Sequence, residues 1–421
     1  MSDPTSRPER TSPNYDLYQR EIFKDGSYGT LPSFSTDPDQ LEAVAASKLS
    51  ERGRLYALSN AGLSLTARTN RAAFAAYQII PRMLRPTLER DISTTLFGHH
   101  IPAPIGFAPV GVNEIYNPEG ELAVASVAGE LGLPYCLSTA SSRSVERVAE
   151  ANDAGAKAAG RAEGGPRFFQ LYLPHNWELA ESLLKRAWDN GFDVCIMTLD
   201  TDHLAWRHGD VAQANYTFYY GQGNEMGWTD PVFHKYLEEK GIDPKKDPKT
   251  AGRAWIDTVW HGKAHSWDDL PRVIKLWKDI SGGKPFVLKG IQCVEDALLA
   301  NRNGCDGIIV SNHAGRQVDG AVASLEMLPE IVDAVGGDMT VMFDSGVRTG
   351  ADVFKALALG AKAVFIGRLW IYGLAIQGAP GVRHVTKSLL ADFDSLMDLA
   401  GYRSLGEVSR AALKIRDIAR L

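Results

Sequence analysis

Short apolar runs recur between residues 102 and 367, and most are followed by a stretch in which apolar positions have helical spacing. Continuous apolar runs of this length are typical of parallel strands that are buried on both faces. Their alternation with helices predicts an α/β fold, a closed (β/α)8 TIM barrel. We expect its eight strands at residues 105–109, 134–138, 168–173, 194–199, 285–289, 307–311, 340–344 and 363–367.

Two segments interrupt this alternation. Residues 151–165 (ANDAGAKAAGRAEGG) are small and rich in glycine, which predicts a mobile surface loop. Residues 201–267 are far longer than an ordinary connection and rich in aromatic side chains. We interpret them as an insertion after the fourth strand that lies over the mouth of the barrel as an active-site lid. Residues 1–50 are predicted to form an N-terminal helical extension, and residues 51–421 the barrel domain.

Composition narrows the class of protein. The chain is 44% hydrophobic and 23% charged with a formal net charge of −6, which favours a soluble globular protein and disfavours nucleic acid as a partner. The polar, Pro-rich N-terminus does not predict a membrane span. None of the four cysteines forms a C-x-x-C pair, so we expect no metal site. The final Ala-Arg-Leu resembles a peroxisomal address, and the alternative is a cytoplasmic protein.

Polar side chains lie at or just beyond seven of the eight predicted strand ends. In such barrels the carboxyl ends of the strands carry the active site, so we predict a ligand site there. The residues are Ser138, Gln170, Tyr172, Thr198, Asp200, Lys289, Ser311, His313, Arg316, Asp344, Arg348, Gly367 and Arg368.

The last two strand ends favour a phosphate group. Residues 344–350 (DSGVRTG) and 366–368 (IGR) combine glycine N–H groups with arginines, where barrels commonly bind phosphate. After the sixth strand, His313 supplies a base that titrates near neutrality, and Arg316 supplies a planar fork for a carboxylate. Either residue alone is explained as an ordinary polar side chain. Together they predict removal of a proton next to a carboxylate.

These residues resemble a known family, the FMN-dependent α-hydroxy acid oxidases and dehydrogenases. The family's loop S-N-H-G-[AG]-R-Q corresponds to Ser311-Asn-His-Ala-Gly-Arg-Gln317. The resemblance runs from about Tyr56 to the C-terminus. Further matching stretches are Pro81-Arg-Met-Leu84, Phe107-Ala-Pro109, Asn117-Pro-Glu-Gly120, Phe169-Gln-Leu-Tyr172, Thr198-Leu-Asp200, Leu288-Lys-Gly290, Phe343-Asp-Ser-Gly-Val-Arg348 and Phe365-Ile-Gly-Arg368.

The resemblance implies roles for the substrate side of the site. His313 is the implied base, for the Cα proton or, if a hydride moves to the flavin, for the hydroxyl proton. Asp200 is the carboxylate that pairs with the resulting imidazolium. The substrate carboxylate is assigned to Arg207, Arg316 and Tyr56, and Tyr172 lies near the substrate hydroxyl, with both a catalytic and a binding role.

The resemblance also implies FMN and its contacts. Lys289 would stabilise negative charge on the flavin ring. The other residues implied to bind FMN are Pro109, Val110 and Gly111 beside the ring, Ser138, Gln170, Thr198 and Ser311 on the ring and ribityl chain, Asp344 on the ribityl chain, and Gly346, Arg348, Gly367 and Arg368 on the phosphate.

Several positions depart from the family pattern. Ala314 replaces the usual glycine beside the base, where the backbone needs an unusual conformation. Ala140 replaces the tryptophan of plant glycolate oxidases, which predicts a roomier pocket. Residues 59–65 (SNAGLSL) lack the usual acidic stretch, so the assignment of Tyr56 depends on its spacing to Thr66.

The long insertion and Gly111 resemble the lactate 2-monooxygenases of the family, which convert lactate to acetate, CO2 and water. We therefore expect oxidation of a small L-2-hydroxy acid with O2. One alternative is a plain oxidase that releases the 2-oxo acid and H2O2. Another, of a different class, is a phosphate-binding barrel without flavin. A homotetramer is expected by analogy alone.

Overall fold

The computed structural model describes residues 10–261 and 264–416, and its centre is a closed barrel of eight parallel strands. The strand order around the barrel is β10-β11-β4-β5-β6-β7-β8-β9. The prediction of a (β/α)8 barrel is confirmed. The barrel strands are β4 (Ile105–Phe107), β5 (Tyr135–Ser138), β6 (Arg167–Leu171), β7 (Val194–Thr198), β8 (Phe286–Ile291), β9 (Gly307–Val310), β10 (Thr340–Phe343) and β11 (Val364–Ile366).

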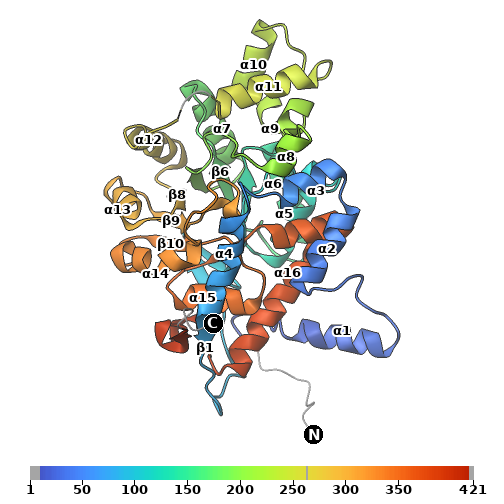
Figure 1. Ribbon diagram of the computed structural model, residues 1–421, viewed down its shortest axis with the longest axis vertical. Helices are drawn as coiled ribbons and strands as arrows, with labels where there is room; N and C mark the ends of the chain where they lie inside the picture. Colours follow the sequence, from blue (N-terminus) through green and yellow to red (C-terminus); the bar gives the residue numbers. More distant parts are fainter. Residues whose placement is uncertain (1–9, 262–263, 417–421) are drawn as a thin grey trace.

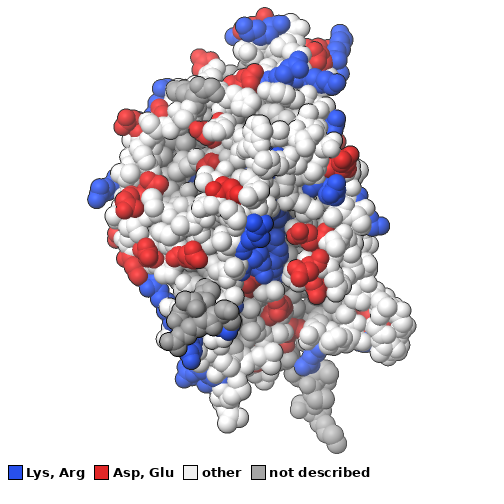
Figure 2. All heavy atoms as spheres, viewed as in Figure 1, with Lys and Arg blue, Asp and Glu red and all other residues white. Residues whose placement is uncertain are grey.

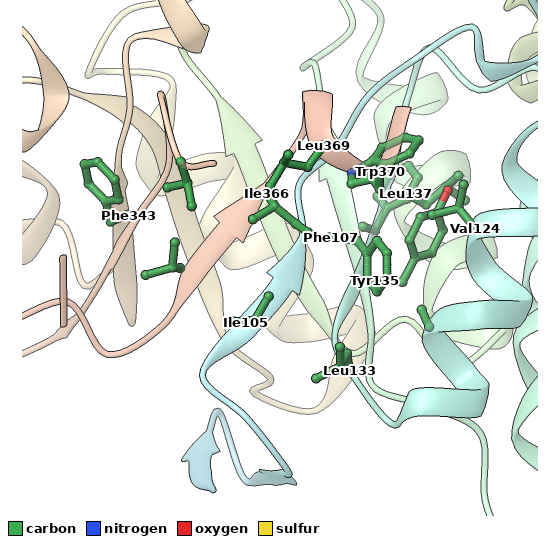
Figure 3. Close-up of a cluster of buried hydrophobic side chains, with 14 of the residues drawn as sticks. Ile105, Phe107, Val124, Leu133, Tyr135, Leu137, Phe343, Ile366, Leu369 and Trp370 are labelled. Atoms are coloured by element: carbon green, nitrogen blue, oxygen red, sulfur yellow. The ribbon is translucent and has the colours of Figure 1, made fainter. Parts of the chain in front are cut away.

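Each barrel strand is followed along the chain by a helix of the outer ring (Figure 1). These helices are α5 (Glu121–Leu131), α6 (Val145–Ala158), α7 (Trp177–Asp189), α12 (Leu270–Ser281), α13 (Val294–Arg302), α14 (Ser324–Val335), α15 (Gly350–Ala358) and α16 (Arg368–Leu399). Side chains of both layers pack together: Val124 of α5, Leu137 of β5 and Trp370 of α16 are buried in one cluster (Figure 3). The strands are therefore apolar on both faces, as the sequence pattern indicated.

The end of the barrel at the amino termini of its strands is covered by a short antiparallel hairpin, β2 (Thr94–Leu96) and β3 (His99–Ile101). Leu96 and Ile101 are buried in the same cluster as residues of the barrel interior, and the Phe97 ring lies 6.2 Å from the ring of Phe168. A second two-stranded sheet pairs β1 (Tyr77–Ile79) with β12 (Leu413–Ile415). One end of the barrel is thus filled, which leaves the carboxyl ends of the strands for a ligand.

Four helices precede the barrel: α1 (Leu17–Ser27), α2 (Pro38–Lys48), α3 (Glu51–Leu58) and α4 (Leu65–Ala73). The first two lie within residues 1–50, and α1 projects from the side of the molecule in Figure 1. The segment before α1 is anchored to α16, because Arg10 forms an ion pair with Asp394. The buried Arg90 forms a second ion pair with the same carboxylate. The division into an extension and a barrel domain at residue 50 stays a prediction.

The segment after β7 forms four helices, α8 (His208–Ala212), α9 (Glu225–Trp228), α10 (Pro231–Glu239) and α11 (Pro248–Val259), gathered at one end of the molecule (Figure 1). Both α10 and α11 begin with proline after an aspartate whose side chain accepts backbone N–H groups of the first turn. Their inner faces are apolar, and Phe233 and Trp255 pack edge to face with ring centroids 5.0 Å apart.

The predicted mobile loop at residues 151–165 is wrong for its first half, because α6 continues to Ala158. The glycine that suggested flexibility is instead required for close packing. A Cβ atom on Gly155 would lie 1.9 Å from the carbonyl oxygen of Ser126 in α5. Glycine here allows two helices to approach each other closely, and only the residues after Ala158 form a connection to β6.

The surface carries charges of both signs. On the face shown in Figure 2, acidic and basic side chains are largely intermixed. Within the described ranges, no helix is both long and apolar enough to cross a membrane. Cys136, Cys195 and Cys305 are buried, Cys293 is half-buried, and all four are free thiols. The C-terminal Ala-Arg-Leu lies outside the described residues, so the peroxisomal address stays a prediction.

Candidate active site

One cavity at the carboxyl ends of the strands collects most of the predicted site residues. Its empty space is about 1180 Å³, open mouth included, which exceeds the need of a single small substrate. The predicted residues that line it are Tyr56, Pro109, Val110, Gly111, Ser138, Tyr172, Arg207, Lys289, His313, Arg316, Asp344, Gly346, Arg348, Gly367 and Arg368. Asp200, Gln170, Thr198 and Ser311 do not line this cavity. Asp200 contacts His313, Gln170 contacts Ser138 and Ser311 contacts Lys289, and each of these partners lines the cavity.

The base candidate is held by a carboxylate. His313 Nδ1 lies 2.7 Å from Asp200 Oδ1, which also accepts a hydrogen bond from Thr201 Oγ1 at 3.1 Å. Burial opposes charge on Asp200, but the charges of His313 and Lys289 and the hydrogen bonds outweigh it and lower the pKa of Asp200 to about 2. Burial also lowers the pKa of His313, although Asp200 opposes this effect. His313 is therefore neutral at neutral pH, as a base must be.

The carboxylate clamp consists of two guanidinium groups around one aromatic ring. The Cζ atoms of Arg207 and Arg316 lie 5.4 and 5.1 Å from the centre of the Tyr56 ring. Arg207 Nε lies 3.1 Å from Asp210 Oδ2, while its buried Nη2 has no hydrogen-bond partner in the described part of the chain. Burial lowers the pKa of Arg207 to about 10, which keeps it charged at neutral pH. A buried cation with a free donor is suited to a carboxylate.

Lys289 carries a second buried positive charge, at the end of β8. Its side chain is 5% exposed, and Nζ lies 3.1 Å from Ser311 Oγ and 3.5 Å from Asp344 Oδ2. Burial alone would lower the pKa of Lys289, but Asp344 and Asp200 raise it above its ordinary value. The sequence assignment of Lys289 as a fixed cation near the cavity is consistent with this geometry.

Two of the residues implied to bind FMN carry unpaired polar groups. Gln170 Nε2 and Thr198 Oγ1 are buried on neighbouring strands without a hydrogen-bond partner among the described residues. Ser138 Oγ donates to Gln170 Oε1 at 3.0 Å and so fixes the amide. Unpaired buried polar groups of this kind are costly unless a ligand pairs with them. The site is therefore complementary to a polar ring system such as that of FMN.

The residues of the predicted phosphate cradle line the same cavity. Gly367 is the N-cap of the 32-residue helix α16, and an added Cβ there would meet nothing closer than 3.9 Å. Gly346 has a φ of 91°, which disfavours any other residue. Arg368 lines the cavity beside Gly367 and donates to the carbonyls of Ala57, at 3.2 Å, and Ala314, at 3.3 Å, so part of its donors are already paired. A helix N-terminus flanked by arginines fits a phosphate.

The insertion supplies an aromatic wall to the cavity. Tyr216, Phe218 and Trp260 line it, and the Trp260 ring lies 4.7 Å from the ring of Tyr172. Sequence reasoning noted these aromatic residues as a group but gave none of them a place in the site. Their position is consistent with the predicted lid, whose closure stays a prediction.

Gly111 and Ala140 lie against each other at the cavity. A Cβ on Gly111 would be 2.6 Å from the Cβ of Ala140, and the N–H of Val112 donates to the Ala140 carbonyl at 2.9 Å. Ala140 also lines the cavity, as expected for a roomier pocket. The position of Ala140 therefore requires a glycine at residue 111.

Ala314, which stands where the family usually has glycine, lies in the left-handed region with φ 57° and ψ 31°. An alanine there costs roughly 1–2 kcal/mol, which glycine avoids. We predict that Ala314→Gly stabilises the protein by about 1 kcal/mol, a rise in melting temperature of about 1–3 °C. Thermal unfolding measures this. Ala72→Gly on the exposed face of α4 is the control and is expected to lower the melting temperature, and a fall for Ala314→Gly as well would contradict the prediction.

Sequence reasoning missed several residues that hold the site together. Asp210 forms an ion pair with Arg207. Ser345 accepts a hydrogen bond from the loop that carries His313, and Asn70 of α4 donates one to the same loop. Ser345 could have been found, because it lies inside the glycine-rich stretch after β10. Asn70 carried no local signal. The described residues contain no group of three or more side chains placed to bind a metal ion.

The chain is similar to known proteins over most of its length. The family described as FMN-dependent dehydrogenase matches residues 45–415. An FMN-dependent α-hydroxy acid dehydrogenase of Penicillium citrinum, qulF, is 46% identical, over 95% of this chain and 96% of its own. An L-lactate oxidase of Lysinibacillus sphaericus is 40% identical, over 87% of this chain and 89% of its own.

Solved structures agree with the fold as well. A crystal structure of mandelate oxidase with benzoyl-formic acid has a TM-score of 0.73 and 32% sequence identity, and the match covers 91% of this chain and 98% of that chain. Together with the site described above, these matches identify the chain as a member of the FMN-dependent α-hydroxy acid oxidase and dehydrogenase family, with FMN as its cofactor.

Proposed function

We propose that the protein oxidises a small L-2-hydroxy acid with O2 in the manner of a lactate 2-monooxygenase. The observation that carries the oxidation chemistry is the 2.7 Å contact between Asp200 and His313, which lines the same cavity as the buried Arg207 and the half-buried Arg316. That arrangement places a neutral base beside a carboxylate-binding pair. Small-molecule substrate and O2 are the only partners that the proposal requires.

In this proposal Arg207, Arg316 and Tyr56 bind the substrate carboxylate and fix its orientation. His313 accepts one proton, from Cα or from the hydroxyl group, and Asp200 stabilises the imidazolium that results. Tyr172 lies beside the substrate hydroxyl. Bound FMN supplies the acceptor for the two electrons, held by the strand-end residues described above and by Lys289. Both orders of proton and hydride removal are consistent with this set of groups.

The fate of the products separates the monooxygenase from the plain oxidase. The aromatic wall of Tyr216, Phe218 and Trp260 supports retention of the 2-oxo acid beside newly formed peroxide, which would yield acetate, CO2 and water from lactate and O2. A site that releases its products early would yield pyruvate and H2O2 instead, and the relative from Lysinibacillus is named an oxidase. Family membership leaves the third alternative, a barrel without flavin, unsupported.

The stoichiometry of one reaction decides between the two. With L-lactate and the FMN-loaded protein, we expect one CO2 and one acetate for each O2 consumed, with little free peroxide. Oxygen uptake, CO2 release and peroxide are measured in the same sample. Recovery of one pyruvate and one H2O2 for each O2 would refute the monooxygenase assignment and leave the oxidase. No oxygen uptake on a panel of L-2-hydroxy acids would refute both.

The pH profile tests His313 as the base. Its pKa is lowered from the ordinary 6.5, so kcat/KM is expected to stay level through neutral pH and to fall only below about pH 6.5. Asp200 raises the pKa of His313, so Asp200→Asn is expected to move this acid limb to still lower pH as well as to slow the reaction. Asp202→Asn, at a half-exposed side chain nearby, is the control and should leave the profile in place. An acid limb that moves to higher pH in Asp200→Asn would contradict the assignment.

The oligomeric state and the location in the cell stay proposals. We retain the homotetramer by analogy with relatives. The peroxisomal address depends on the C-terminal Ala-Arg-Leu. Because a peroxisomal location suits an enzyme that releases H2O2, this address counts toward the plain oxidase.

A further inference from the structure

The loop that carries His313 has a strained backbone. His313 and Ala314 are consecutive residues with φ values of 55° and 57°. A residue other than glycine rarely adopts this conformation, because its Cβ comes too close to the following carbonyl oxygen. Such strain persists only where surrounding groups hold the backbone in place. The structure shows which groups these are.

The first group is a pair of side-chain amides. Asn70 Nδ2 donates to Asn312 Oδ1 at 2.7 Å, and Asn312 Nδ2 donates back to Asn70 Oδ1 at 2.8 Å. Both residues are buried, with 2% and 7% of their surface exposed. Asn312 Oδ1 also accepts the N–H of Gly315 at 3.2 Å, so the amide pair is connected directly to the backbone just after His313 and Ala314. Asn70 belongs to α4, which precedes the barrel in the chain.

The second group is Ser345, whose Oγ accepts the N–H of Ala314 at 3.0 Å and donates to Asp344 Oδ1 at 2.8 Å. Shape adds a third restraint between α4 and the loop. A Cβ on Gly315 would lie 2.5 Å from the backbone nitrogen of Ala67, and the N–H of Ala61 donates to the Gly315 carbonyl at 3.0 Å. The loop is therefore held from the barrel side and from the α4 side.

We propose that Asn70 is a positioning residue for His313: through its amide pair with Asn312 it holds the strained loop and so keeps the imidazole on Asp200. We call the pair Asn70 and Asn312 the amide latch. The inference rests on the proposed function, because it takes His313 to be the base. It differs from the site described above in that the hydrogen bonds of the Asn70 side chain within the described residues go to Asn312 and Ser324, neither of which lines the cavity.

The test is a mutant cycle in the FMN-loaded protein. Asn70→Ala removes one half of the amide latch and should lower kcat about 10- to 100-fold, as a misplaced base does, while KM and FMN content stay within about threefold. Ala314→Gly removes the cost of the left-handed conformation. It should therefore restore kcat at least about fivefold in the Asn70→Ala background, and much less in the wild-type background. Thr69→Ala, on the exposed side of the same helix, is the matched control and should change nothing.

A second measurement does not depend on turnover. Hydrogen exchange of a peptide that covers residues 311–317 should be at least about tenfold faster in Asn70→Ala than in wild type, because Asn312, whose Oδ1 accepts the N–H of Gly315, loses its own anchor. Other barrel loops should keep their exchange rates. The same measurement is made on Asn70→Asp, which retains the Oδ1 acceptor and is the milder variant if Asn70→Ala folds poorly.

Three results would overturn the inference. They are unchanged exchange in the 311–317 peptide, an equal rate gain from Ala314→Gly in both backgrounds, or a loss of activity that merely follows a loss of FMN and of folded protein. Failure of the proposed function looks different. In that case the wild-type protein oxidises no 2-hydroxy acid, whereas the exchange of the loop still reports whether the amide latch holds it.

Discussion

Replacement of His313 by glutamine should abolish most of the turnover. A positioned general base contributes about 10²–10⁴-fold to a rate, so we expect kcat to fall by that factor. Glutamine keeps the size and polarity of the side chain but cannot accept the substrate proton. Because Lys289 and the predicted phosphate cradle are unchanged in this variant, FMN content should stay near the wild-type value. Stopped-flow measurement of the bleaching of bound FMN gives the rate directly.

The control for this variant is His203→Gln. His203 lies on the same side of the barrel, but its side chain is 76% exposed and its partner is the exposed Asp202. We expect its kinetics to match those of the wild type. If His313→Gln retained more than a tenth of the wild-type rate, the base would have to be another group, and Tyr172 would be the next to test.

Loss of the buried cation of Lys289 should have the second-largest effect. Lys289→Met keeps the length of the side chain and removes its charge from a site with only 5% exposure. A preorganised charge that stabilises a developing anion contributes about 10²–10³-fold, so the bleaching of bound FMN by substrate should slow by this factor. The substrate KM should change much less, because the carboxylate clamp of Arg207 and Arg316 is intact.

Two further variants separate charge from folding. Lys289→Arg keeps a cation beside Asp344 and should recover part of the rate. Lys289→Met also leaves the Asp344 carboxylate without its ion pair, so the melting temperature is measured alongside. A Lys289→Met protein that is stable, binds FMN and reacts at the wild-type rate would show that the cation has no part in the chemistry.

The sequence pattern was sufficient for the barrel because its strands are buried on both faces. Each of the eight predicted runs corresponds to a strand of the closed barrel, with ends that differ by only a few residues. The error at α6 has a clear physical reason. The glycines of this segment were interpreted as a sign of flexibility. At Gly155, however, the backbone of Ser126 in the neighbouring helix lies so close that only glycine fits. A sequence alone does not distinguish these two uses of glycine.

The site could be predicted as far as it follows chain order. Polar residues directly after barrel strands must lie on one rim, so the cavity collects His313, Lys289 and Asp344 as expected. Asn70 lies 242 positions from its partner Asn312, on a helix that precedes the barrel. No local pattern connects residues so far apart in the chain. The geometry of the amide latch therefore had to come from the structure.

The contact between Gly111 and Ala140 constrains how this pocket can change over evolution or in the laboratory. An added methyl at Gly111 would come within 2.6 Å of the methyl of Ala140 and 2.9 Å of its carbonyl oxygen, so a larger residue at position 111 is blocked while Ala140 keeps its place. Gly111→Ala as a single step is thus closed unless the segment of Ala140 shifts. A library that varies both positions together reaches combinations that one-at-a-time substitution does not.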